Sequence, residues 1–287
     1  QLPITVIIGL FCVGLGIKSA LYPFHPWVPD AYGYATPIAS AVLSSLISKG
    51  YIFLLLKIFY RVIGIDVVMA NHALNLLFAF GLMAMIFGSL SAIRSHDLRR
   101  MVAFSSVAQV GYIYAGIGLG NTAGMIAALF HLLTHSLGKS MLFLSASGLS
   151  DASGDSKRFD DLRGAGYRYP AAGAAFTVGA LSMVGIPILG GFFSKVYFAG
   201  AAFEVGGAPM WLMLGALAIS TLLNAIYFMH TVMSLYRRPK EGFTPRPFVK
   251  SRLASAALLT LAGLNLCIGF FSQPLLQIIQ RGLAIFS

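Results

Sequence analysis

Apolar runs long enough to cross a bilayer recur along almost the whole chain, and they limit it to one class of fold. The 287 residues are 57% hydrophobic and 10% charged, with a mean hydropathy of +0.81. A membrane-crossing helix needs about 20 apolar residues, whereas a barrel strand needs about half as many. We therefore expect an all-α, polytopic membrane helix bundle. The predicted spans number about eight, at 3–28, 36–60, 70–93, 101–119, 121–148, 170–202, 209–236 and 252–284.

The lysines and arginines between these spans are unevenly divided. Thirteen fall in the segments 94–100, 151–169 and 237–252, and three fall on the opposite side, at Lys57, Arg61 and Arg281. Cytoplasmic loops carry the excess of positive charge in membrane proteins. The rich side is predicted to be cytoplasmic, with both ends of the chain on the outer side of the plasma or inner membrane. This distribution explains the net charge of +11 better than a nucleic-acid partner does.

The remaining four basic residues are all lysines inside apolar runs: Lys18, Lys49, Lys139 and Lys195. A lysine at the bilayer centre costs at least ~2.5–3.5 kcal/mol, so such residues are usually functional. Snorkelling of a lysine from a helix end is the alternative for one of them. All nine acidic residues fall in predicted loops or at span ends, which leaves the lysines without an obvious carboxylate partner.

Two of the predicted spans contain helix breakers next to a lysine. Lys18 is followed by Pro23, Pro26 and Pro29, and Lys195 is preceded by Gly185, Pro187 and Gly190. Paired spans interrupted by glycine and proline are typical of inverted-repeat transporters, whose sites lie at the interruptions. We expect two discontinuous helices, with Lys18 and Lys195 facing the protein interior.

The fifth span carries three titratable residues, His131, His135 and Lys139, at a spacing of four. This spacing places them along one helix face. Because histidine titrates near neutral pH, such a stripe suits a proton relay. Packing histidines are the simpler alternative. Zinc bound by the two histidines is disfavoured, since no acidic or thiol partner stands nearby.

The fourth span is unusually polar for a bilayer segment, with Ser105, Ser106, Gln109 and Tyr112. These side chains either hold water near the relay or bond neighbouring helices, and the sequence leaves both interpretations open. Cys12 and Cys267 form no paired motif. We therefore expect no cofactor and no metal, which argues against a redox subunit that binds quinone or a metal cluster.

Four segments together carry a family resemblance: KSALYPFHPWVPDAY, DLRRMVAFSSVAQVGY, HLLTHSLGKSMLFL and GALSMVGIPILGGFFSK. They resemble the antiporter-like membrane subunits of respiratory complex I, membrane-bound hydrogenases and multisubunit sodium/proton antiporters. Such subunits have about fourteen spans that include two inverted five-helix repeats. The resemblance implies one transmembrane domain in which 1–66 ends the first repeat, 67–236 forms the second, and 237–287 adds a loop and a helix. It also implies that the N-terminal part of the family fold is absent.

The resemblance also implies roles for individual residues. Lys18 and Lys195 match the lysines of the two broken helices, Lys49 the linking residue, and His131, His135 and Lys139 the central relay. Gln109 stands where many relatives have histidine, so this position is expected to hold water without titrating. The glutamate that pairs with the first lysine in relatives lies in an earlier span that is absent here.

The function implied is proton translocation within a larger NADH dehydrogenase-type or hydrogenase-type membrane complex. Other membrane subunits would then be partners, and the redox chemistry would lie elsewhere in the complex. A subunit of a multisubunit Na⁺/H⁺ antiporter is the alternative. Few intramembrane carboxylates argue mildly against direct Na⁺ binding, although backbone carbonyls at a helix break can serve as ligands.

Overall fold

The computed structural model describes residues 2–239, 248 and 251–284, and its regular structure there is helical. The elements, in chain order, are α1 (Leu2–Ser19), α2 (Val28–Tyr34), α3 (Pro37–Val42), the π-helix η1 (Leu43–Ile47), α4 (Ser48–Lys57), the π-helix η2 (Ile58–Ile63), α5 (Ile65–Ala70), α6 (Ala73–Ile93), α7 (Leu98–Gly118), α8 (Thr122–Asp151), α9 (Ala165–Arg168), α10 (Pro170–Val184), α11 (Gly190–Val205), α12 (Gly207–Leu235), α13 (Arg252–Phe270) and α14 (Ser272–Leu283).

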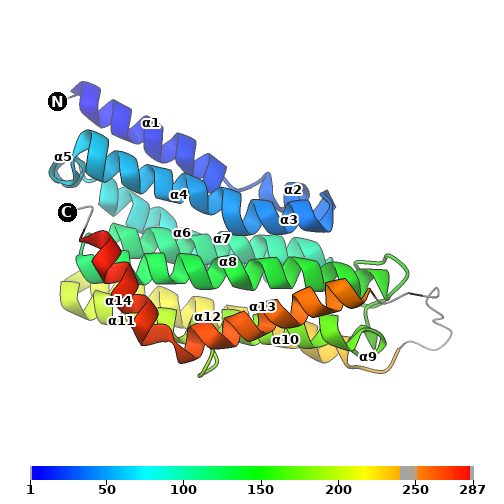
Figure 1. Ribbon diagram of the computed structural model, residues 1–287. Coiled ribbons are helices and arrows are strands. Elements are labelled where there is room, and N and C mark those ends of the chain that lie inside the picture. The colour runs from blue at the N-terminus through cyan, green and yellow to red at the C-terminus, as the bar shows by residue number, and fades with distance from the viewer. Residues whose placement is uncertain (1, 240–247, 249–250, 285–287) are drawn as a thin grey trace.

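Most of the long helices run along a common direction, with α7 at the centre, and α14 crosses them obliquely (Figure 1). In the apolar 18-residue stretch of α7, 94% of the window is buried inside the bundle, whereas in that of α13 only 22% is buried. The helices α1 and α4 lie along one side of α6, α7 and α8, and α10 to α13 lie along the other (Figure 1). The polar residues of α7 therefore face protein on every side, and α13 presents most of its surface outward.

Within the described residues, six helices are long and apolar enough to cross a membrane: Pro37–Ile63, Ala73–Ile93, Leu98–Gly118, Thr122–Asp151, Gly207–Leu235 and Arg252–Phe270. The first of these comprises α3, η1, α4 and η2 in one continuous run. The predicted span 170–202 is divided between α10 and α11, whereas the predicted span 3–28 contains α1 and the connection to α2, which begins at Val28. The prediction of one span over 252–284 is wrong in detail, because the helix ends at Phe270 and α14 starts after Phe271.

The first interruption separates α1 from α2, between Ser19 and Val28, and contains Pro23 and Pro26. Pro29 was predicted to break the helix, but it lies buried in the first turn of α2. The first-turn amides of a helix have no intrahelical acceptor, so a proline there loses no hydrogen bond. Pro29 begins a helix rather than ending one.

The second interruption covers 185–189, between α10 and α11. Gly185 ends α10 with φ +91°, which favours glycine, and Pro187 follows in the connection. Gly190 was also predicted to break the helix, but it is the first residue of α11. A Cβ at Gly190 would lie 2.8 Å from Ile268, and one at Gly191 would lie 1.8 Å from the Ser182 carbonyl. These two glycines allow close packing of α11.

Small residues hold α6 against α7. A Cβ built on Gly81 would lie 2.4 Å from the backbone nitrogen of Ala115, and one on Gly118 would lie 2.4 Å from that of Phe78. Gly88 and Gly111 meet the opposite backbone in the same way, at 2.6 Å each. Close backbone approach through small residues is the usual packing mode of membrane helices.

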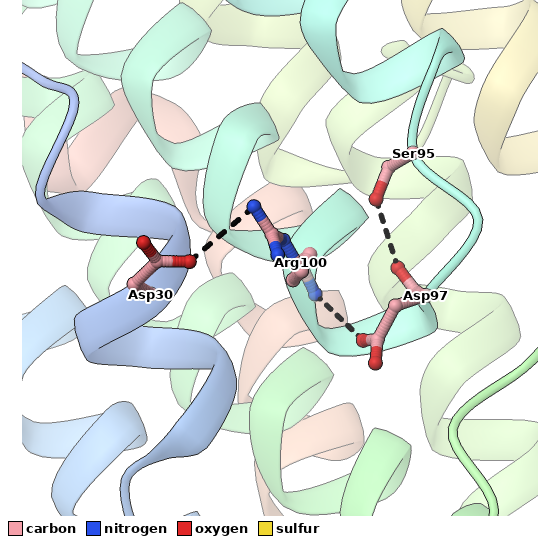
Figure 2. A network of polar contacts seen from close by, with 4 residues as sticks. All are labelled: Asp30, Ser95, Asp97 and Arg100. Carbon is pink, nitrogen blue, oxygen red and sulfur yellow. Dashed lines mark hydrogen bonds and ion pairs between the residues drawn. The ribbon is translucent and has the colours of Figure 1, made fainter.

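The described parts of the cation-rich segments lie at one end of the bundle, while α1 starts and α14 ends at the other (Figure 1). The backbone amide of Leu98 donates to the Lys157 carbonyl, which joins the first two segments. Asp97 caps α7 by accepting from the backbone amides of Arg99 and Arg100. Figure 2 shows the contact with Arg100, whose side chain also pairs with Asp30 of α2 at 3.3 Å. The cations Lys240, Arg246 and Lys250 of the third segment lie outside the described residues.

Arg99 is predicted to be one of the loop cations, but its side chain is buried, at 5% exposed. Its guanidinium donates to Ser40 Oγ at 2.8 Å and to the carbonyls of Tyr32 and Ala35. The last carbonyls of a helix have no intrahelical donor. Arg99 supplies donors at the end of α2 and so ties the second half of the interrupted helix to α7.

Candidate functional site

Lys49 is the second residue of α4, which follows the π-helix η1, and it is 4% exposed. Its Nζ donates to the Ser44 carbonyl and to Ser48 Oγ, the latter at 3.2 Å. Ser48 Oγ also donates to the Ser44 carbonyl, at 3.1 Å. Single π-turns within α-helices are frequent at functional sites. Here the π-turn carries the carbonyl that holds the buried ammonium group.

Serine hydroxyls connect this region to α7. Ser44 Oγ and Ser106 Oγ are 3.1 Å apart, and Ser106 Oγ also donates to the Val102 carbonyl at 3.1 Å. Ser105 Oγ donates to the same carbonyl at 2.8 Å. Ser105 and Ser106 therefore lie side by side between η1 and the interior of the bundle.

Lys139 completes this network from α8. Its side chain is fully buried, and its Nζ donates to the Val102 carbonyl at 2.9 Å and to Ser105 Oγ. The groups between Lys49 and Lys139 thus belong to one set of hydrogen bonds, formed by hydroxyls and two backbone carbonyls. A hydroxyl both donates and accepts, whereas a carbonyl only accepts. The hydroxyls of Ser48 and Ser44, and those of Ser106 and Ser105, meet only through the carbonyls of Ser44 and Val102. A proton that moves between the lysines therefore needs a further donor, such as water, at these two points.

Beyond Lys139, polar side chains are buried with few partners. His135 is fully buried and neither ring nitrogen has a partner among the described residues. The same holds for both polar atoms of the Gln109 side chain, for the Tyr112 hydroxyl and for His131 Nε2. Buried polar atoms in native proteins nearly always have a partner, and ordered water is a common one. These residues define a polar region with room for added hydrogen bonds.

The histidine rings form a stack on α8. The centroids of His131 and His135 are 6.0 Å apart with nearly parallel planes, and Tyr112 lies against His131 at 5.4 Å. His131 Nδ1 is 2.9 Å from Ser194 Oγ of α11. The spacing of four along α8 therefore does place these residues on one face, and that face meets α7 and α11.

Lys195 follows Ser194 and reaches back to the interruption. Its Nζ donates to the Met183 carbonyl at 3.2 Å and to the Val184 carbonyl, and it lies 5.8 Å from the centroid of the Tyr112 ring. Cations are favourable at helix C-termini, where carbonyls lack donors and the helix dipole is negative. The break at Gly185 supplies the acceptors for this lysine.

Lys18 does not join the other three lysines. It lies in the last turn of α1 and is exposed in this chain, contrary to the prediction that it faces the interior. The reason is the position of α1 at the edge of the bundle, where it packs on α4 and α6. The next residue, Ser19, points inward and its hydroxyl is 2.7 Å from that of Tyr114.

In the described part of the chain no ion pair joins Lys18, Lys49, Lys139 or Lys195 to a carboxylate; ion pairs there include Arg100–Asp30 and Arg163–Asp160. The serines that contact Lys49 and Lys139 were only partly predicted. Ser44, Ser48 and Ser194 were missed, although Ser40, Ser44 and Ser48 repeat every fourth residue ahead of Lys49. That repeat is the signal that could have located Ser44 and Ser48.

Residues 1–224 match the family described as NADH:quinone oxidoreductase/Mrp antiporter, TM. The chain belongs to this family. It is a polytopic membrane protein, as the length of its apolar runs predicts, and the family resemblance of the four motifs is confirmed.

Three relatives show which proteins the chain is similar to. The NADH-quinone oxidoreductase subunit N of Desulforudis audaxviator (strain MP104C) is 39% identical over 246 residues, 84% of this chain and 48% of that protein. The putative antiporter subunit mnhA2 of Staphylococcus aureus (strain JH9) is 29% identical over 281 residues, 91% of this chain and 34% of that protein. A chain of the membrane-bound sulfane sulfur reductase, an archaeal respiratory membrane complex, superposes with a TM-score of 0.84 at 27% identity, covering 96% of this chain and 54% of its own.

The chain spans between about a third and a half of the length of these curated relatives.

Proposed function

We propose that this chain is the proton-conducting part of an antiporter-like membrane subunit. The path runs from Lys49 through the serine hydroxyls to Lys139 and then along α8 to Lys195. The observation that supports the first half of this path is that Lys49 bonds the Ser44 carbonyl, the Ser44 hydroxyl meets that of Ser106, and Lys139 bonds the neighbouring Ser105 hydroxyl. Amines and hydroxyls with fixed neighbours are suited to passing protons, and lysine is costly to bury without such a role.

The second half of the proposed path, from Lys139 to Lys195, depends on water rather than on serine hydroxyls. Between Lys139 and Lys195 stand His135, Gln109 and His131, whose unpartnered polar atoms line the face of α8. We propose that water fills the hydrogen-bonding needs of these groups and carries the proton to Ser194 and Lys195. Gln109 would hold water there without titrating.

The orientation follows from the loop cations. The cation-rich end is proposed to be cytoplasmic, with the start of α1 and the end of α14 on the outer side of a plasma or inner membrane. The two interrupted spans support an inverted-repeat arrangement, with 1–66 ending one repeat, 67–236 forming the next and 237–287 following it. An exposed lysine at bilayer depth is unfavourable, so Lys18 is proposed to be covered by protein outside this chain.

The host is proposed to be a multisubunit complex of the NADH dehydrogenase or hydrogenase type, with charge changes in a neighbouring subunit driving the protons. The matches to an oxidoreductase subunit and to a respiratory complex support this host. A cation/proton antiporter that moves Na⁺ against H⁺ is the second candidate, supported by the match to a putative antiporter subunit. Carbonyls at the α10–α11 break are the kind of oxygen ligand that Na⁺ would need, and Na⁺ would compete there with Lys195 for the carbonyls of Met183 and Val184.

Substitution of Lys139 tests the proposal in the assembled complex in inside-out membrane vesicles. Lys139→Ala should abolish proton uptake while assembly persists. Lys139→Arg should also fail, because a guanidinium keeps its proton at any accessible pH. Lys57→Arg, at the exposed end of α4, is the matched control and should leave uptake unchanged.

The two roles of Lys139 make opposite predictions for arginine. A lysine that only bridges α7 and α8 could be replaced by arginine with uptake preserved. Full uptake in the Lys139→Arg variant would therefore refute the relay. The same vesicles, assayed with and without Na⁺, separate the two candidates: a strict requirement for Na⁺ would favour the antiporter.

A further inference from the structure

A cavity of about 500 Å³ opens at the cation-rich end of the bundle, where α2, α6 and α7 meet. Figure 2 shows side chains beside it, with Arg100 between Asp30 and Asp97. The acid in its lining, Asp97, already accepts from two backbone amides at the start of α7. The basic, hydroxyl-bearing and aromatic residues of the lining include Tyr34, Ser91, Arg94, His96, Arg100 and Phe104. Basic groups therefore outnumber the one acid that lines the cavity.

Arg94 is a cation of this cavity whose side chain has no acceptor. It is exposed and makes no hydrogen bond or ion pair with the described residues, whereas Arg100 pairs with Asp30 at 3.3 Å. Lys157 adds positive charge at the rim, because its Nζ lies 5.4 Å from the centroid of the Tyr34 ring. The planar guanidinium of arginine presents several N–H donors in a geometry that matches phosphate oxygens. The cavity therefore suits an anion that carries phosphate.

Arg94 also lies where α6 leaves the membrane, since α6 is one of the helices able to cross it and ends at Ile93. Phe87, Ser91 and Arg94 follow one another at spacings of four and three, which places them on one helix face. Phe87 is seven residues from Arg94, about 10 Å deeper at 1.5 Å per residue. It is 45% exposed, and its ring stacks on that of Tyr22 at a centroid distance of 5.2 Å. This face of α6 is thus apolar at depth and basic at the surface.

We infer that the cavity binds the headgroup of an anionic phospholipid, whose phosphodiester accepts from the Arg94 guanidinium while an acyl chain lies along α6 over Phe87. Basic pockets between membrane helices bind headgroups of this kind. A zwitterionic lipid offers the same phosphate but brings a cation toward Arg94 and Lys157, so a net negative headgroup is favoured. The inference goes beyond the proposed function, because the residues that line the cavity do not belong to the proposed proton path.

Lipid binding to the purified complex that contains the full-length subunit tests the site. The complex is delipidated in a neutral detergent, and native mass spectrometry follows the binding of phosphatidylglycerol and phosphatidylcholine. Arg94→Gln should bind one phosphatidylglycerol fewer than the parent, with the apparent affinity of that lipid lowered about fivefold or more. Arg237→Gln is the matched control, because Arg237 is an exposed arginine at the same end that does not line the cavity. It should bind phosphatidylglycerol as the parent does, and phosphatidylcholine should bind alike to all three proteins.

Inorganic phosphate distinguishes a lipid headgroup from a free anion. It shares the phosphate oxygens but lacks the acyl chain that would lie over Phe87, so millimolar phosphate should leave the bound phosphatidylglycerol in place. Displacement of the lipid by phosphate would assign the cavity to a free anion and overturn the lipid site.

A second variant, Ser91→Phe, tests the space in the cavity instead of its charge. It leaves every cation in place and puts a larger side chain into the lining. Binding in the cavity predicts a loss like that of Arg94→Gln, whereas general attraction of anionic lipid to the cation-rich end predicts no loss. Parent-like binding by both variants, which is also the result expected if protein outside this chain covers the cavity, would overturn the site. Equal losses in Arg94→Gln and Arg237→Gln would overturn it as well.

Discussion

The hydroxyl pair Ser44–Ser106 allows a prediction in which stability and transport respond differently. Each serine is changed to alanine, singly and together. The hydroxyls are 3.1 Å apart, but their other partners differ. Ser106 Oγ also donates to the Val102 carbonyl, whereas Ser106 is the one described side-chain partner of Ser44 Oγ.

The expected magnitudes follow from what each substitution leaves behind. Ser106→Ala leaves the Ser44 hydroxyl buried without its partner, which costs ~1–3 kcal/mol. Ser44→Ala leaves Ser106 bonded to the Val102 carbonyl, so only the net value of one hydrogen bond is lost, ~0.5–1.5 kcal/mol. If protons pass between these hydroxyls, either substitution removes the step. A barrier raised by ~1–3 kcal/mol slows transport by ~5–150-fold.

Thermal unfolding of the purified complex in detergent gives the stability order, and proton uptake in vesicles gives the transport rate. Ser106→Ala should unfold at a lower temperature than Ser44→Ala, while both lose transport to a similar extent. Ser145→Ala is the control, because Ser145 is a fully buried serine of α8 that bonds the carbonyls of Met141 and Leu142 in its own helix. Near-normal transport by Ser44→Ala would refute conduction through the serine pair.

Two further predictions concern packing and orientation. Gly81→Ala should destabilise the protein by ~1–3 kcal/mol, since the added Cβ meets the Ala115 backbone. Gly215→Ala, which has open space around the added Cβ, should not destabilise it. Thermal unfolding in detergent compares the two variants, and equal effects would contradict the α6–α7 contact. In intact cells, an impermeant thiol reagent should modify His72→Cys and not His96→Cys or Arg158→Cys, and the reverse pattern would invert the proposed topology.

The architecture could be predicted largely from the length of the apolar runs. Helices are the segments of that length that satisfy their own backbone in a bilayer, so the all-α class and most span positions follow directly. The spacing of His131, His135 and Lys139 likewise fixes one face of α8, because helix periodicity is independent of what packs there. Burial of Lys49 and Lys139 follows from their places inside long apolar runs.

Other features depend on packing that no local pattern encodes. Proline lies in the interruption at Pro23 but in the first turn of a helix at Pro29. The difference is that backbone amides in the first turn of a helix have no intrahelical acceptor, so a proline there loses no hydrogen bond. The exposure of Lys18 depends on what covers α1. The contact between Ser44 and Ser106 joins residues 62 positions apart and requires the π-turn, whose backbone hydrogen bonds leave no trace in the side-chain sequence.

The glycine contacts between α6 and α7 have a consequence for timing. Where backbone meets backbone, no side chain can change rotamer to let one helix slide past the other, so the pair moves as one rigid body. Ser105 and Ser106 belong to α7 and therefore keep fixed positions relative to α6. The movements that the proposed relay needs are then left to side chains that end on these two helices and to the helices around them, whose displacements take microseconds to milliseconds. Any slow conformational step of the proposed relay therefore comes from outside the α6–α7 pair.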